Sequence, residues 1–165
     1  MSKAKVKKPK FATGDETVAL NRRARFDYEI EDSLEAGIML TGTEVKSVRR
    51  GDVQIAESYA SLETGPKQMP EAWLHNMHIA PYKEGGASNV EVRRKRKLLL
   101  RRDQLNKLLS STQQKGFTLV PLKMYFTRGK AKLEIGVAKG RKQHDKRQAI
   151  EDRETKRDLK RAVNE

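Results

Sequence analysis

Two segments near the carboxyl end carry hydrophobic residues at every second position, and this alternation restricts the fold more than any other feature. In residues 117–126 these positions are Val120, Leu122, Met124 and Phe126, and in residues 130–138 they are Leu133, Ile135 and Val137. A period of two predicts β-strands, and the short turn around Gly129 predicts a hairpin whose apolar faces meet. Pro121 has no backbone N–H to donate, so we expect it at a sheet edge or a bulge.

The first half of the chain contains four more segments that are typical of strands. Residues 25–32 alternate Phe26, Tyr28 and Ile30 with polar residues, and residues 36–42 follow after a short turn, so we expect these two segments to pair. Residues 58–63 and 72–80 predict a second pair. The Gly- and Pro-containing residues 64–71 between them predict an irregular loop.

One helix is predicted over residues 101–116 and a shorter one around residues 44–51. In the longer segment the apolar side of the helix comprises Leu105, Leu108, Leu109 and Thr112. Gly116 suits the position just after the last turn, where a left-handed backbone conformation is common.

Six or so antiparallel strands with two or three short helices predict a mainly β protein. We expect a small closed antiparallel β-barrel of the OB type over residues 17–138, and a two-sheet sandwich is the alternative. Residues 1–16 predict a disordered basic arm, because residues 1–10 hold five lysines and no acid. Residues 139–165, with ten basic and six acidic residues, predict a basic tail that is disordered by itself.

The formal net charge of +14 and the pI near 10.1 indicate a polyanionic partner. Nucleic acid is favoured over a membrane surface, because no apolar helix face accompanies the basic runs. The chain has no cysteine, which excludes disulfides and thiolate metal sites and suits the reducing cytoplasm. No apolar run approaches the roughly 18 residues of a transmembrane helix.

The histidines do not favour enzymatic or metal chemistry. His75 and His78 lie three apart in one predicted strand, so they would point to opposite faces and could not share an ion. His144 and Asp145 are adjacent and lie in a tail that cannot hold catalytic geometry. The G-x-S-x-G motif is absent as well. We therefore expect neither enzymatic activity nor a cofactor.

The basic run from Arg93 to Lys97 precedes three leucines, Leu98 to Leu100. We expect the leucines to anchor this segment in the core while Arg94 and Arg96 face RNA phosphates. A solvated basic strand is the alternative, and it would leave the positive charges to repel one another.

Three motifs together resemble the SmpB family of tmRNA partners: AGIMLTGTEVKSVR at residues 36–49, RRKRKLLL at 93–100 and GVAKGRKQHDKR at 136–147. The resemblance extends from about Thr17 to Arg161. It implies an OB-like barrel that binds the tRNA-like domain of tmRNA. The protein would be a monomer and would form a 1:1 complex with tmRNA. It also implies delivery of tmRNA to stalled ribosomes for trans-translation, without enzymatic activity. The tail, residues 139–165, would be helical on the ribosome and would occupy the vacant decoding site and mRNA channel.

The resemblance also implies roles for particular residues. Those aligned with tmRNA-binding positions are Asn21, Glu35, Leu99 and Lys132. Read simply as structure, they would be a cap, a surface acid, a core leucine and a strand lysine. Those aligned with the ribosome-binding tail motif are Gly140, His144, Asp145, Lys146 and Arg147. The tail departs from the family at Glu151, where many members have a basic residue.

A tail ordered by ribosomal RNA gives His144 a physical role, because RNA-binding proteins often stack a ring on an exposed base. Two other functions remain open. One is a structural ribosomal protein, which shares the charge and the basic ends. The other is an RNA-processing enzyme that uses His144 or His78.

Overall fold

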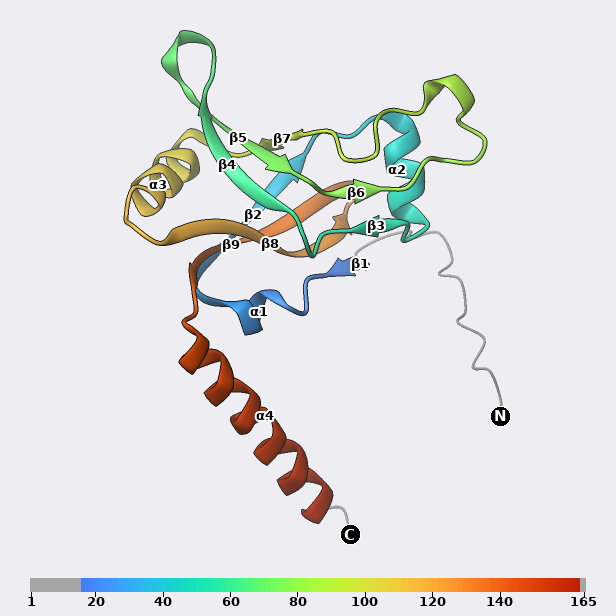
Figure 1. Ribbon diagram of the computed structural model, residues 1–165. Coiled ribbons are helices and arrows are strands. Elements are labelled where there is room, and N and C mark those ends of the chain that lie inside the picture. The colour runs from blue at the N-terminus through green and yellow to red at the C-terminus, as the bar shows by residue number, and fades with distance from the viewer. Residues whose placement is uncertain (1–15, 164–165) are drawn as a thin grey trace, which may run out of the picture.

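The computed structural model describes residues 16–163, and for residues 143–145 it describes the backbone only. The disordered arm predicted for residues 1–16 lies almost wholly outside these residues. The described chain is mainly β, with one large antiparallel sheet, as predicted (Figure 1).

Seven strands form the large sheet in the order β1-β8-β4-β5-β7-β2-β9. Their bounds are β1 Thr17–Leu20, β2 Tyr28–Ile38, β4 Tyr59–Thr64, β5 Pro70–His75, β7 Arg96–Leu99, β8 Phe117–Thr127 and β9 Lys130–Gly140. Two short strands, β3 (Val53–Gln54) and β6 (His78–Ile79), pair separately.

Helices lie at opposite ends of this sheet. The α-helices are α1 Ala24–Asp27, α2 Gly42–Arg49, α3 Arg102–Thr112 and α4 Gln143–Val163, and two short 3₁₀ turns are η1 Pro66–Gln68 and η2 Gly86–Ser88. In Figure 1, α3 and α2 flank the sheet on either side, while α4 extends away from it. Both predicted internal helices are present. Gly116 does not follow the helix directly, because α3 ends four residues earlier and Gly116 (φ +90°) turns the chain into β8.

The predicted hairpin is confirmed as β8 and β9, and the prediction for Pro121 is also confirmed. The register of the two strands shifts between Pro121 and Lys123, so Pro121 lies at a bulge. A bulge inserts one residue and reverses which side chains face the core. Val120 and Leu122 therefore pack with Ala24 and Ala138 in a small second cluster, and the prediction of one shared face is wrong.

The predicted pairing of residues 25–32 with residues 36–42 is wrong. Phe26 lies in α1, and residues 28–32 and 36–38 belong to a single strand, β2. Residues 33–35 between them form no turn, because β9 pairs along β2 on both sides of a register shift between Ile30 and Asp32. Asp32 remains at the surface, where Lys107 of α3 contacts it at 2.8 Å.

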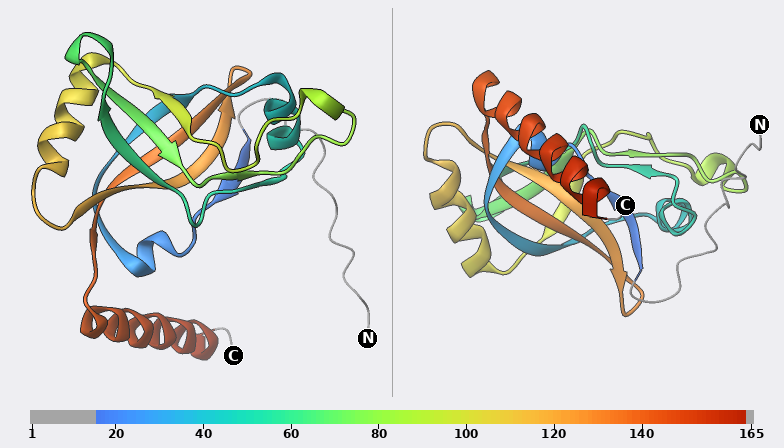
Figure 2. Two further views of the ribbon diagram at one scale, coloured as in Figure 1. Left: turned by 45° about the horizontal axis from the view of Figure 1, so that its top comes forward. Right: turned by 90° about the horizontal axis from the view of Figure 1, so that it is seen from below.

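The sheet curls until both of its ends contact β8 (Figure 2). β9 pairs with β8 along the whole hairpin, but β4 pairs with it only at Ala60 and Leu119. β1 occupies the same edge of β8 further along, opposite Lys123 to Tyr125, which limits the contact with β4. The sheet is therefore strongly curled but is not the closed barrel that we expected, because β4 and β8 share only one residue pair.

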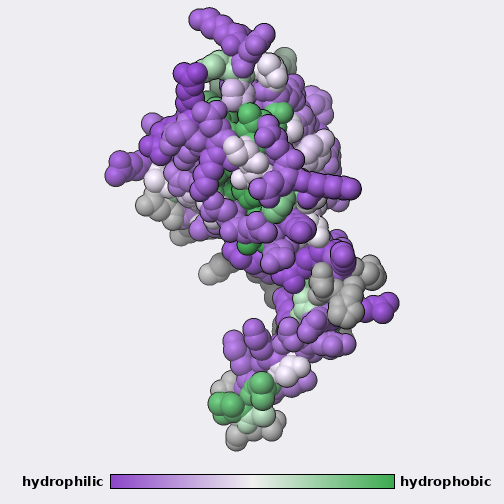
Figure 3. Space-filling view, turned by 90° about the vertical axis from the view of Figure 1, so that its left-hand side faces the viewer, coloured by the Kyte–Doolittle hydropathy of each residue, from purple (hydrophilic) through white to green (hydrophobic). Residues whose placement is uncertain are grey.

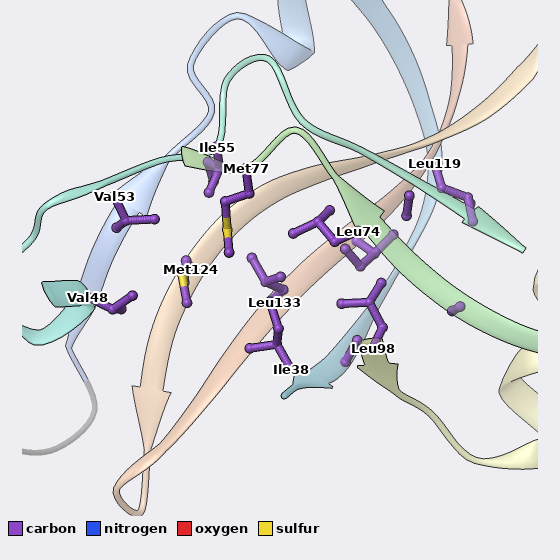
Figure 4. Close-up of a cluster of buried hydrophobic side chains, with 14 of the residues drawn as sticks. Ile38, Val48, Val53, Ile55, Leu74, Met77, Leu98, Leu119, Met124 and Leu133 are labelled. Carbon is purple, nitrogen blue, oxygen red and sulfur yellow. The ribbon is translucent and has the colours of Figure 1, made fainter. Parts of the chain in front are cut away.

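The main core fills the space enclosed by this curl. Figure 4 shows the side chains of Leu74, Leu98, Met124 and Leu133 converging from different strands, together with Met77 from the link between β5 and β6. Val48 of α2 and Leu108 of α3 close the two ends of the core and are almost fully buried. The outer faces of β4, β5 and β7 carry half-exposed polar and aromatic side chains, whereas α1 covers part of the outer face of β8 and β9.

Candidate nucleic-acid interface

Three of the residues that were aligned with tmRNA-binding positions meet on one face of the molecule. Glu35 of β2, Leu99 of β7 and Lys132 of β9 line a hollow of about 650 Å³ between the sheet, α3 and the start of β5. Figure 3 shows the side of the molecule that carries α3, where hydrophobic atoms are exposed within a hydrophilic surround. We call this hollow the groove.

Leu99 forms a ridge between the groove and a second hollow of about 420 Å³, since both are lined by Gly37, Leu99 and Lys132. Leu99 is 51% exposed, whereas the preceding Leu98 is buried. Leu98 therefore packs in the core, and the alternative interpretation of Leu99 as a core leucine is wrong. Gly37 lies opposite Leu99, and a Cβ there would approach the Cβ of Leu99 to 3.1 Å.

Glu35 is held in place by two neighbours. The Tyr125 hydroxyl donates a hydrogen bond to Glu35, and Lys132 Nζ lies 3.7 Å from Glu35 Oε1. Burial and this hydrogen bond to a carboxylate raise the pKa of Tyr125, so its hydroxyl keeps its proton. The groove thus presents an ordered carboxylate acceptor beside a lysine.

The expected contact of Arg96 with phosphate is wrong, because its side chain is fully buried. It forms an ion pair with Glu44 of α2, and its Nη1 donates to the Met77 carbonyl at 2.7 Å. Its Nη2 donates to the Val92 carbonyl at 3.2 Å. Arg96 is a core residue that joins α2 to β7.

Arg94 contacts the same carboxylate but stays partly at the surface. Its Nε lies 3.2 Å from Glu44 Oε1, and its side chain is 30% exposed. Burial opposes ionisation of Glu44, but hydrogen bonds from Arg94, the Thr41 amide and Arg96 outweigh it and lower the pKa of Glu44 below its usual range. Glu44 therefore stays ionised between the two arginines.

Sequence reasoning missed Glu44, although a signal for it exists. Thr41 and Glu44 have the T-x-x-E spacing of a capping box, and each side chain contacts the backbone N–H of the other residue at the start of α2. The rest of the basic run is also neutralised within the chain. Lys95 Nζ lies 3.0 Å from Glu63, and Lys97 Nζ lies 2.8 Å from Glu71. The positive charges of residues 93–97 are therefore not left to repel one another, and the argument against a solvated basic strand is wrong.

Asn21 lies away from the groove and is 8% exposed. Its Nδ2 donates to the Pro121 carbonyl at 2.9 Å, and its Oδ1 accepts from the Ala24 amide at 3.2 Å. These bonds fix the entry into α1 and attach it to the β8 bulge. The geometry is that of a structural cap.

The tail residues follow the last strand directly. Gly140 ends β9 opposite Tyr28, and α4 begins three residues later. Lys146 Nζ lies 3.6 Å from Asp27 Oδ1, and Arg147 is exposed. The side chains of His144 and Asp145 lie outside the described part of the chain.

His75 and His78 belong to different strands, β5 and β6, and to different sheets, so the assumption of one strand is wrong. Among the described side chains, no group of three His, Asp or Glu residues could hold a metal ion. Within residues 16–163, no helix is long and apolar enough to cross a membrane.

A strongly basic, mainly β chain with an apolar ridge and a charged groove on an open sheet face defines a nucleic-acid-binding class of protein. The sequence matches the SmpB protein family over residues 18–165. The chain belongs to this family.

Individual relatives are similar over nearly their whole length. An SsrA-binding protein of Thermobifida fusca is 48% identical over 160 residues, which cover 97% of each chain. An SsrA-binding protein of Staphylococcus carnosus is 47% identical over 165 residues, covering 100% of this chain and 99% of that one. A solved structure described as tmRNA–SmpB and the bacterial ribosome is 48% identical, with a TM-score of 0.63, covering 84% of this chain and 95% of the other.

Proposed function

We propose that the protein binds the tRNA-like domain of tmRNA and delivers it to stalled bacterial ribosomes for trans-translation. The observation that carries this proposal is the meeting of Glu35, Leu99 and Lys132 in one groove. These residues come from three strands that are far apart in sequence. The family membership and the names of the relatives, which are SsrA-binding proteins, support the choice of RNA.

The chemistry of the groove suits a folded RNA with exposed bases. Leu99 offers an apolar surface to a base or ribose, and Glu35 accepts hydrogen bonds from base amino or ribose hydroxyl groups. Lys132 in the groove, and the partly exposed Arg94 outside it, supply positive charge for phosphates, so binding weakens as salt increases. Asn21 contributes indirectly, by holding α1 against β8.

The tail supplies the ribosomal step in this proposal. In the structure α4 comprises 21 residues, a helix of roughly 30 Å. Gly140 ends β9, and His144, Asp145, Lys146 and Arg147 lie in the first turns of α4. All five belong to the motif that enters the vacant decoding site and mRNA channel. The expectation that this tail orders only against RNA stays a prediction.

The proposal includes five finer statements. The curled sheet acts as an OB-like barrel, and the protein works in the cytoplasm. It is a monomer in a 1:1 complex with tmRNA, no cofactor takes part, and there is no enzymatic activity. A lack of RNA cleavage on incubation with labelled tmRNA would separate this function from that of an RNA-processing enzyme.

Replacing Leu99 with alanine should weaken binding of the tRNA-like domain roughly fivefold, because about 1 kcal/mol of apolar burial is lost on binding. The melting temperature should not change, since Leu99 is half exposed in the free protein. Gel-shift titration and thermal unfolding measure the two effects.

Leu109→Ala is the matched control, because Leu109 is also exposed but does not line the groove. Equal affinities for the Leu99 and Leu109 variants would contradict the assignment of the groove.

A further inference from the structure

The outer face of β4, β5 and the start of β7 carries an aromatic surface with two lysines and two glutamates, and the family motifs include only its lysines. We call this face the platform, and its side chains are Tyr59, Ser61, Glu63, Glu71, Trp73, His75, Lys95 and Lys97. Their strand neighbours Ala60, Ala72, Leu74 and Leu98 point into the core. The alternation along each strand therefore directs the platform residues outward.

Two rings on the platform are already stacked. The rings of Tyr59 and His75 lie 5.1 Å apart with an interplanar angle of 15°. His75 Nε2 lies 2.7 Å from the Ser61 hydroxyl and 3.5 Å from Glu63, which fixes the imidazole. Tyr59 is 49% exposed. The pair is thus a preordered aromatic surface that is open to solvent.

The third ring, Trp73, is covered by ammonium groups. Lys95 Nζ lies 4.5 Å and Lys97 Nζ 6.0 Å from the centre of the Trp73 ring. The same lysines pair with Glu63 and Glu71, at 3.0 and 2.8 Å. Ion pairs of this kind at a surface are weak, so a phosphate can replace the carboxylate without large cost.

The platform continues directly into the groove. Lys97 and Glu71 line the groove as well, and Leu99 is two residues beyond Lys97 on the same face of β7. From the strand spacing and the rise per residue, Tyr59 lies about 16 Å from Leu99. One RNA molecule bound at the groove can therefore reach the platform.

We propose that the platform is a second part of the RNA interface. This inference rests on the function proposed above. An exposed base of the tRNA-like domain stacks on the Tyr59–His75 pair, and adjacent phosphates bind Lys95 and Lys97. RNA is preferred over a protein partner because the platform is continuous with the groove, and because aromatic rings beside lysines suit single-stranded RNA in a chain of net charge +14.

The test compares three variants for binding to the isolated tRNA-like domain of tmRNA. Tyr59→Ala should lose about five- to hundredfold in affinity, the range for removal of one base–aromatic stack. Tyr59→Phe should retain nearly full affinity, because the ring remains. Leu20→Ala, on the exposed part of β1, is the control and should bind as the parent protein does. Thermal unfolding of each variant verifies that the fold is intact.

A salt titration tests the lysines. Lys95→Ala should reduce the slope of log K against log salt by about one, as expected for one lost phosphate contact. An unchanged slope would remove Lys95 from the interface.

The outcomes separate this inference from the proposed function. If Leu99→Ala binds weakly while Tyr59→Ala binds normally, the platform is not an RNA surface and the function stands. If both bind normally, the groove assignment fails as well. If Tyr59→Ala binds tmRNA normally but fails in ribosome rescue, the platform contacts a different partner and the inference is overturned.

Discussion

Replacing Arg96 with methionine is expected to lower the free energy of unfolding by about 3–5 kcal/mol, a large part of the stability of a domain of this size. The variant leaves Glu44 buried with only Arg94 as its charged partner, and it frees the carbonyls of Met77 and Val92. Urea unfolding followed by circular dichroism measures the loss.

A double-mutant cycle shows whether the ion pair itself is responsible. Glu44→Leu together with Arg96→Met replaces both charges by apolar groups, and it should be less destabilised than the sum of the single variants. Arg94→Met is the matched control, because that side chain is 30% exposed and its loss should cost much less. A loss below 1 kcal/mol for Arg96→Met would contradict a role for Arg96 in the core.

The same ion pair predicts a pH dependence. The pKa of Glu44 is lowered in the folded protein, so its contribution to stability is present above the usual carboxyl pKa of about 4.3. That contribution is lost as the pH falls through the lowered pKa. The stability difference between the parent protein and Arg96→Met should therefore be largest at neutral pH and shrink below about pH 4.

A chain truncated after Gly140 should lose ribosome-rescue activity completely while still binding the tRNA-like domain with nearly full affinity. The last strand ends at Gly140, and the contacts of the removed segment with the body are few, chiefly Lys146 with Asp27 and the Arg141 amide with the Asp27 carbonyl. We expect less than about 1 kcal/mol of stability to be lost, or roughly 2–4 °C in melting temperature. A rescue assay in vitro and a binding titration on the same preparation measure both properties.

Residual rescue by the truncated chain would contradict the role proposed for the tail. A large fall in melting temperature would instead mean that α4 supports the body. Asp27→Asn in the full-length chain is a useful control, because it weakens the contact with Lys146 and leaves the tail present.

Within the full-length chain, His144→Ala should reproduce much of the loss of rescue, and His144→Phe should restore part of it. A stacking contact of about 1–3 kcal/mol requires a ring but no proton transfer. If phenylalanine were as inactive as alanine, a hydrogen-bonding or proton-transfer role would replace the stacking role.

Sequence patterns predicted the elements correctly where neighbouring residues alone decide the local structure. The β8–β9 hairpin, the bulge at Pro121 and the helix α3 follow from alternation, a missing N–H and a leucine periodicity. The extent of β2 could not be predicted in the same way. Its acidic middle resembles a turn until β9 is placed beside it, and that partner lies about a hundred residues further along the chain.

The candidate site likewise has features that the sequence predicts and features that depend on long-range packing. The basic character, the family motifs and the choice of Glu35, Leu99 and Lys132 as candidates all follow from the order of the residues. It could not show that Leu98 rather than Leu99 enters the core, or that Arg96 is buried against Glu44. Both depend on which face of β7 turns inward, and this is set by β2 and β5 on either side of it. The folded chain shows which charges of the basic run meet carboxylates and which surface remains for RNA. These pairings could not be predicted from neighbouring residues, because they join residues 26–52 positions apart.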